Sequence, residues 1–357
     1  MKKFLLEIIK RLMAIPASFI LRKHQPKIII GVTGSVGKTT TKEAIFFVLE
    51  KKFGNRVGKS EGNLNTRLGI PLVILGFVKN PAVWLWPAVV IYSFVKAPFV
   101  RRLPEILVLE YAIDYPGEFK ILIKLIRPKI AVITRIGPAH LEFFNNIESI
   151  YKEKSELVKA LPKDGWAVLN EKDKLVKKMA KETKTKVIYY DGESPIDQAK
   201  EAAKKVGKIL GISEEESQRI LSDFKMPDRR LQIFKGIKNT KIIDDTYNAN
   251  PISMEIALDY LKNLSGKRKV AFLGDMLELG KDTAEFHRKI GEFAREKVDF
   301  LIGVGELARN FQADKFFPDS EKAGKQALKI IKDGDIILVK GSRGMKMEKI
   351  VAAIRGK

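Results

Sequence analysis

The chain has 357 residues, of which 45% are hydrophobic and 31% charged, a composition that predicts a folded globular protein of two or three domains. Cysteine is absent and only three histidines occur, which excludes a disulfide framework, a thiol nucleophile and a cysteine-ligated metal, and argues against a multi-histidine metal site. Lys and Arg exceed Asp and Glu by 23, a surplus that favours polyanionic partners such as nucleotides, nucleic acids or anionic lipids.

The N-terminal segment, residues 1–25, is basic and amphipathic. Its apolar residues recur at helical spacing until Pro16, which we expect to interrupt the helix. No small-residue cleavage site of a secretory signal follows, and the apolar run is too broken to span a bilayer. Residues 1–27 carry seven Lys and Arg against Glu7 alone. Together with residues 79–102, which hold four cations and no acid, they supply +10 of the net charge of +23.

A second apolar segment, residues 82–95, lies inside an insert over 77–104. It contains no charged residue, two of the three tryptophans and a tyrosine, and basic residues flank it. Aromatic rings with a Lys and Arg rim are typical of a membrane–water interface. We interpret segments 1–20 and 82–95 as contacts to an anionic membrane surface. The alternative is that 82–95 is a buried helix or a protein interface on which the first segment packs.

From residue 27 onward, short β-branched runs alternate with helical patterns, which is typical of parallel sheets flanked by helices. Strands are expected at 27–32, 105–112, 128–136, 165–170, 186–190, 240–247, 268–276, 298–305 and 335–341. Helices are expected from Thr39, after Pro116, at 148–161, 196–211 and 213–224, from Pro251, and at 282–296. We therefore expect an α/β protein with a P-loop-type central ATPase domain on a parallel sheet over 26–227 and a Rossmann-like C-terminal domain over 228–357.

A glycine-rich turn follows the first strand and opens a helix, which is the setting of a phosphate-binding loop. Lys38 is expected to reach the β- and γ-phosphates, and the Thr39 hydroxyl to hold Mg²⁺. The usual spacing has glycine five residues before Gly37, where this chain has Val32. The alternative is a purely structural glycine turn. The nucleotide-binding residues expected in this loop are Thr33, Gly34, Ser35, Gly37, Lys38, Thr39 and Thr40.

Further motifs follow the loop in a fixed order. They are EGNLNTRLGIP (61–71), LEYAIDYPGEF (109–119), ITRIGPAHLEFF (133–144), EKSEL (153–157), DDTYNANPISM (244–254), LGDMLELG (273–280) and KGSRGMKME (340–348). With the phosphate loop, this series resembles the Mur ligase family, and most closely its MurF branch. The resemblance implies an ATP-dependent amide ligase that adds D-alanyl-D-alanine to a muramoyl-peptide precursor of peptidoglycan, through an acyl phosphate.

The resemblance also implies a two-magnesium site and a set of catalytic residues. Thr39 and Glu110 would bind the first Mg²⁺, and His140 the second. Lys154 matches the family's carbamylated lysine, and its carbamate would support magnesium. The open alternatives are a helix-capping role for Glu110, a structural histidine, and a register in which Lys152 replaces Lys154 as the modified lysine.

Other positions acquire roles by the same resemblance. Arg230 would reach the γ-phosphate, with Arg229 as the competing assignment. Nucleotide contacts are implied for Asp245, Tyr247, Asn248 and Asn250. Acceptor and amine contacts are implied for Asn63, Asn65, Asp275, Glu278, Lys340, Ser342 and Arg343.

The sequence departs from the family in the part that precedes the first strand, where the family's uridine-binding domain has no counterpart. The acceptor could therefore differ, and a lipid-linked or polyglutamyl acceptor is the alternative within this chemistry. A nucleic-acid-binding P-loop ATPase is the alternative from another class, although no nucleic acid partner is expected, because the basic aromatic segments lie outside the nucleotide motifs. We expect a cytoplasmic enzyme, peripheral on the inner face of the cell membrane.

Overall fold

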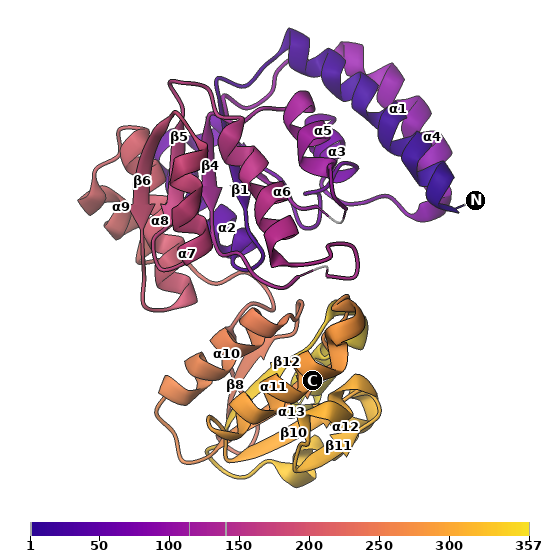
Figure 1. Cartoon of the computed structure of the whole chain (residues 1–357), viewed down its shortest axis with the longest axis vertical. Coiled ribbons are helices and arrows are strands. Elements are labelled where there is room, and N and C mark those ends of the chain that lie inside the picture. Colours follow the sequence, from indigo (N-terminus) through magenta and orange to yellow (C-terminus); the bar gives the residue numbers. More distant parts are fainter. Residues whose placement is uncertain (1, 114, 140, 357) are drawn as a thin grey trace. The chain divides into compact units, whose positions relative to one another are not determined.

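The computed structural model describes residues 2–113, 115–139 and 141–356. The chain divides into two compact units, one of residues 1–136 and 148–224 and the other of residues 137–147 and 225–357. The division falls close to the expected boundary at Met226-Pro227-Asp228, and a short segment from the first half of the sequence joins the second unit. Each unit is an α/β structure built on a six-stranded sheet (Figure 1).

The sheet of the first unit is entirely parallel, in the order β2-β3-β1-β4-β5-β6. Its strands are β1 (Ile28–Thr33), β2 (Val57–Lys59), β3 (Ile106–Glu110), β4 (Ile130–Ile133), β5 (Trp166–Asn170) and β6 (Lys186–Tyr190). β1 lies between β3 and β4, so the loops that follow these three strands emerge at the same edge. This edge is where open α/β sheets bind their ligands.

The helices of the first unit flank its sheet or pack on one another. They are α1 (Lys2–Lys23), α2 (Lys38–Phe53), α3 (Gly69–Ile74), α4 (Trp86–Lys96), α5 (Glu118–Leu125), α6 (Ile147–Lys159), α7 (Lys174–Lys178), α8 (Pro195–Ile209) and α9 (Glu214–Leu221). α2, α8 and α9 pack together over one apolar cluster that includes Val32, Ile45 and Val206. Burial of such aliphatic side chains is the main driving force for assembling these layers.

Our expectation that Pro16 interrupts the first helix is wrong. α1 runs unbroken from Lys2 to Lys23 with Pro16 inside it. A proline in a helix removes one backbone hydrogen bond, but α1 buries Met13, Ala17 and Ile20 completely. It packs on α3 and α4 and lies beside α4 in Figure 1. This tertiary packing compensates for the lost hydrogen bond. Within the described residues, no helix is long and apolar enough to cross a bilayer.

The sheet of the second unit has the order β11-β10-β9-β12-β8-β7. Its strands are β7 (Gln232–Lys235), β8 (Lys241–Asp245), β9 (Lys269–Gly274), β10 (Phe300–Val304), β11 (Lys315–Phe317) and β12 (Ile336–Lys340). Helices α10 (Pro251–Asn263) and α11 (Thr283–Arg295) contribute to the apolar cluster on one face, and α12 (Ser320–Ile330) and α13 (Glu348–Arg355) to the cluster on the other.

The Rossmann-like second sheet has one strand that was not expected, β7, which runs antiparallel to β8. β7 is an edge strand whose residues alternate between partly buried and exposed, unlike the continuously buried central strands. Such alternation suits an edge strand with one covered face. β7 directly follows the boundary segment. Because β7 and β8 are antiparallel, a hairpin connects them, and no helical crossover is needed.

Candidate nucleotide and metal site

The glycine-rich turn between β1 and α2 has the backbone geometry that phosphate binding requires. Gly34 has φ 149° and Gly37 has φ 86°. Residues other than glycine rarely adopt these backbone conformations. Gly37 is the residue directly before α2, so the turn leads into the N-terminus of a 16-residue helix, where the first backbone N–H groups have no partner within the helix and the helix dipole is positive. The loop therefore offers an anion site.

Thr134, at the end of β4, supports this loop from the neighbouring strand. Its hydroxyl donates to the backbone oxygens of Val36 at 2.6 Å and Thr33 at 3.1 Å. The N–H of Ser35 donates to the carbonyl of Arg135 at 2.6 Å. The sequence analysis did not single out Thr134, although its position directly after a buried strand, at the sheet's carboxyl edge, is a signal that could have found it.

Thr39 and Glu110, both expected as metal ligands, are in contact. The Thr39 hydroxyl donates to Glu110 Oε2 at 2.8 Å, and Asn65 Nδ2 donates to Glu110 Oε1 at 3.0 Å. Glu110 is 2% exposed and is the last residue of β3, and its backbone N–H donates to the Ser60 hydroxyl at 3.1 Å. Ser60 is a second positioning residue that the sequence analysis missed.

This donor set suits magnesium. Mg²⁺ in nucleotide sites is commonly held by one or two carboxylates with phosphate oxygens and water, and a buried carboxylate beside a hydroxyl at the phosphate loop supplies the protein's share. No group of three or more His, Asp or Glu side chains that could hold a metal occurs among the described residues. His140, the expected ligand of the second Mg²⁺, lies outside the described residues.

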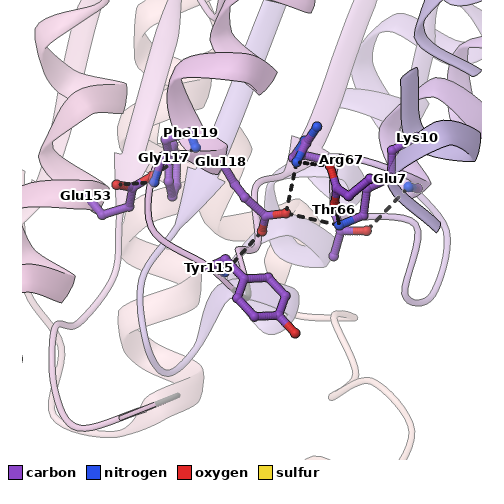
Figure 2. Close-up of polar contacts among 10 residues, drawn as sticks. Glu7, Lys10, Thr66, Arg67, Tyr115, Gly117, Glu118, Phe119 and Glu153 are labelled. Carbon is purple, nitrogen blue, oxygen red and sulfur yellow. Dashed lines mark hydrogen bonds and ion pairs between the residues drawn. The ribbon is translucent and has the colours of Figure 1, made fainter. Parts of the chain in front are cut away.

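The two candidates for the modified lysine differ in environment. Lys154 is 4% exposed, with its Nζ 5.9 Å from the centre of the Phe119 ring, whereas Lys152 is exposed. Between them, Glu153 accepts hydrogen bonds from the backbone N–H groups of Gly117 at 2.9 Å and Phe119 at 3.0 Å (Figure 2). α6 thus holds the start of α5, and the buried position belongs to Lys154.

In the second unit, Arg230 and Arg229 also differ in their surroundings. The Arg230 guanidinium lies over the Tyr247 ring at 4.1 Å from its centre. Arg229 has a positive φ of 60° and its Nη1 lies 3.1 Å from Glu348 Oε1. The two arginines therefore have separate environments, and it is Arg230 that lies beside a residue expected to contact the nucleotide.

Asp245 and Lys340, expected in different roles, form one ion pair, in which Lys340 is buried and Asp245 partly exposed. Lys340 Nζ lies 2.5 Å from Asp245 Oδ2 and donates to the carbonyl of Asn248 at 2.9 Å. β8 and β12 are neighbours, which brings both residues to the same end of the sheet. Asn250 is the N-cap of α10, with its side-chain oxygen accepting the Ser253 N–H at 2.9 Å. Its side chain thus has a structural role here.

Of the other residues expected to bind substrate, some lie in the interior and others on the surface. Asp275 is buried and accepts the Ala308 N–H at 2.7 Å, and burial raises its pKa. The Ser342 hydroxyl accepts the Leu277 N–H at 2.9 Å. Glu278 has a positive φ of 64°. The Arg343 and Asn63 side chains are exposed.

Comparison with known proteins identifies both halves of the chain. The Mur ligase middle domain matches residues 32–86 and 90–227, and the glutamate ligase domain of Mur ligases matches residues 229–343. The UDP-N-acetylmuramoyl-tripeptide–D-alanyl-D-alanine ligase of Bacillus subtilis is 32% identical, over 90% of this chain and 75% of the relative. The Escherichia coli ligase of the same name is 26% identical, over 94% and 78%.

Solved structures of similar proteins agree with these relatives. The MurF ligase of Thermotoga maritima, solved with ADP, superposes with a TM-score of 0.80 at 26% identity, over 97% of this chain and 83% of that one. MurF of Acinetobacter baumannii gives the same TM-score at 24% identity, over 98% and 80%, which supports the shared fold.

Proposed function

Because this chain belongs to the Mur ligase family, we propose that it is an ATP-dependent ligase that joins D-alanyl-D-alanine to the peptide carboxylate of a UDP-N-acetylmuramoyl tripeptide. The observation that carries this proposal is the contact of Thr39 with the buried Glu110 carboxylate at the mouth of the glycine loop. It couples a phosphate site to a metal-binding carboxylate, which phosphoryl transfer requires. Family membership favours the ligase over a nucleic-acid-dependent ATPase.

The reaction divides into two steps. In the first, an oxygen of the acceptor carboxylate attacks the γ-phosphorus of ATP, the bond to the β-phosphate oxygen breaks, and ADP leaves. In the second, the dipeptide amine attacks the acyl carbon, phosphate leaves with its electron pair, and the amine loses a proton. Both steps bring anionic groups together, so positioned cations carry much of the rate enhancement.

The roles of the described residues follow from this chemistry. Lys38 would neutralise the β- and γ-phosphates, with the loop N–H groups around them. Arg230, held over Tyr247, would meet the charge on the transferred phosphoryl group, since a permanently charged planar guanidinium suits that task. Asp245, Tyr247 and Asn248 would contact the nucleoside.

We place the magnesium ligands at Thr39 and Glu110 for one ion and at His140 for a second. Bound Mg²⁺ would neutralise phosphate charge during transfer. Lys154 is the proposed site of a carbamate, since a buried lysine converted to an anion could support a metal. Asn63, Asn65, Asp275, Glu278, Lys340, Ser342 and Arg343 stay proposals as substrate residues.

The experiment is ADP release with D-alanyl-D-alanine and UDP-linked muramoyl tripeptide, followed by the mass of the product. Lys38→Ala should lower turnover by at least a hundredfold. Lys51→Ala, an exposed lysine on the last turn of the same helix, is the matched control and should keep wild-type turnover. ADP release that is indifferent to both substrates, or robust product from Lys38→Ala, would contradict the proposal.

One observation favours a different form of the acceptor substrate. α1 and α4 together expose large apolar side chains, and basic residues accompany them. They include Phe4, Leu5, Ile8, Ile15 and Phe19 of α1, Trp84, Ile91, Tyr92 and Val95 in or beside α4, and Phe99. We call this set the apolar–basic surface. The second candidate is that this surface contacts anionic membranes and that the acceptor is lipid-linked. A product from a lipid-linked muramoyl peptide but not from its UDP-linked form would favour this candidate over the UDP-linked acceptor proposed above.

A further inference from the structure

α1 has two faces with different properties. Phe4, Ile8, Ile15 and Phe19 recur at spacings that place them on one stripe of a helix, and their exposed fractions run from 38% to 73%. On the opposite side, Met13 and the residues that follow it at helical spacing are fully buried. Lys10 belongs to this inner side, with a side chain only 9% exposed.

Lys10 takes part in a cluster of four charged side chains, Glu7, Lys10, Arg67 and Glu118, which we call the α1 ion cluster (Figure 2). Lys10 Nζ lies 2.9 Å from Glu7 Oε1 and 3.4 Å from Glu118 Oε1. Arg67 Nη1 lies 3.1 Å from Glu7 Oε2 and 3.7 Å from Glu118 Oε1. The cluster joins α1 to two segments that are about 60 and 110 residues further along the chain.

Both segments lead directly to Glu110. Arg67 is two residues beyond Asn65, which donates to the Glu110 carboxylate and accepts the Ala112 N–H at 2.8 Å on its backbone oxygen. Glu118 begins α5, and its Oε2 accepts the Tyr115 N–H at 3.2 Å, within the loop that follows Glu110. The α1 ion cluster therefore holds the loops on both sides of the carboxylate that we assign to magnesium.

The charges in this cluster depend on one another. Glu118 is 5% exposed and Arg67 13% exposed, so removal of one partner leaves a charge poorly solvated. Burial lowers the pKa of Lys10, but its hydrogen bonds and charge interactions with Glu7 and Glu118 outweigh this and leave the pKa raised. Lys10 is therefore protonated at neutral pH, as the cluster needs.

We propose that Lys10 is a positioning residue for the magnesium site, and that docking of the inner face of α1 orders the Asn65 and Tyr115 loops around Glu110. The helix that carries the outward apolar stripe is thus also part of the support of the catalytic centre. This inference rests on the proposed function for the identity of the metal site, but the contacts that it uses do not depend on the substrate.

The test compares Lys10→Gln in the full-length chain with the wild type. Binding of Mn²⁺ to the protein–ADP complex, followed by the EPR signal of free Mn²⁺, should weaken by about tenfold. Amide hydrogen exchange should accelerate by a similar factor in peptides that contain Ala112 and Tyr115. Lys10→Arg keeps the charge and should restore both values to within about threefold of the wild type.

Lys120→Gln is the matched control, because Lys120 lies on α5 close to Glu118 but its side chain is 70% exposed. It should change neither measurement. Glu7→Gln is the milder variant if Lys10→Gln does not fold, since the Glu7 side chain is 44% exposed. Exchange and Mn²⁺ affinity within twofold of wild type in Lys10→Gln, or no rescue by Lys10→Arg, would overturn the inference. Absence of ligase product from the wild type would instead contradict only the proposed function.

Discussion

At the scale of single residues, burial separates positions that the sequence leaves equivalent. Lys152 and Lys154 lie on the same helix, and the sequence alone gives no physical reason to prefer one of them as the modified lysine. In the structure Lys154 is buried and Lys152 is exposed, because only one of them faces the body of the unit. We therefore propose Lys154, and not Lys152, as the site of the carbamate.

His287 provides a prediction about pH and stability. The side chain is fully buried, with Nε2 accepting the Met276 N–H at 3.0 Å and Nδ1 lying 2.7 Å from the Thr283 carbonyl oxygen. Burial lowers its pKa, and the hydrogen bond to Thr283 opposes that effect only in part. The stability that neutral His287 provides is therefore fully present above its unfolded pKa, about 6.5, and is lost as the pH falls through the lowered value.

We expect His287→Gln to cost about 1–3 kcal/mol at pH 7.5, through the weakened bond to Met276. The wild type should lose more stability than the variant between pH 7.5 and pH 5.0, because glutamine does not titrate. Amide hydrogen exchange of α11 peptides at increasing urea concentration measures the stability of each protein at the two pH values. The difference between the two proteins removes the contributions of Asp244 and Asp275, whose pKa values burial raises. Equal losses on acidification would show that His287 does not contribute.

The sequence identified the chemistry of single residues better than their contacts. The pair of Thr39 and Glu110 was expected from the resemblance, and the structure brings the two side chains together. Asn250 was expected to contact the nucleotide, yet its side chain caps α10. Asparagine before proline is both a good helix cap and a polar group at a strand end, so the residue type alone could not decide.

At the scale of elements, the phosphate loop depends on the close approach of β1, α2 and the end of β4. A Cβ added to Gly34 would lie 1.9 Å from Thr134 Oγ1, and this hydroxyl also bonds to the loop carbonyl of Val36. Neither the Gly34 backbone nor the Thr134 hydroxyl can move aside without a change in the shape of the loop. The φ of 149° at Gly34 adds backbone strain for any other residue.

Gly34→Ala should therefore weaken ADP binding by at least tenfold, as measured by calorimetry with the full-length protein, and should lower stability by about 1–3 kcal/mol. Gly211→Ala is the control, since Gly211 also has a positive φ of 81° but an added Cβ meets nothing within 4 Å. It should lower stability by about 1–2 kcal/mol with unchanged ADP affinity. Similar loss of ADP affinity in both variants would mean that general destabilisation, not the loop, is responsible.

Elements with a continuous apolar run were predictable, and short or context-dependent ones were not. β1, β3 and β12 are buried along nearly their whole length and were expected from their β-branched runs. β2 has only three residues, too few for a pattern. α1 continues through Pro16 because its inner face is fully packed, which no local pattern reports.

At the scale of the whole molecule, the positive charge is unevenly distributed. Residues 1–27 and 79–102 carry +10 of the +23, and they include α1 and α4, which lie side by side in the first unit (Figure 1). The sequence located both segments and their charge. Packing of the first segment on the second was anticipated only as the alternative to a membrane contact, because the sequence alone does not decide a contact that depends on the tertiary structure.

This distribution leads to a prediction about membrane binding. Basic residues near an anionic surface contribute about 1 kcal/mol each, and salt reduces that term because the Debye length falls from about 10 Å at 0.1 M to about 3 Å at 1 M. Exposed aromatic side chains add an apolar term that salt does not weaken. Trp84 and Phe99, which are 79% and 76% exposed, are the strongest candidates for that term.

We expect the full-length protein to co-sediment with vesicles that contain phosphatidylglycerol at least tenfold better than with phosphatidylcholine vesicles at 0.1 M NaCl. This preference should largely disappear at 1 M NaCl. Trp84→Ala with Phe99→Ala should weaken binding at both salt concentrations. Ile233→Ala with Leu328→Ala, which removes exposed apolar side chains from the second unit, should leave binding unchanged. Negligible binding of the wild type to both vesicles would contradict the membrane contact, and salt-independent binding would contradict the role of charge, because a surface that binds through its cations must respond to screening.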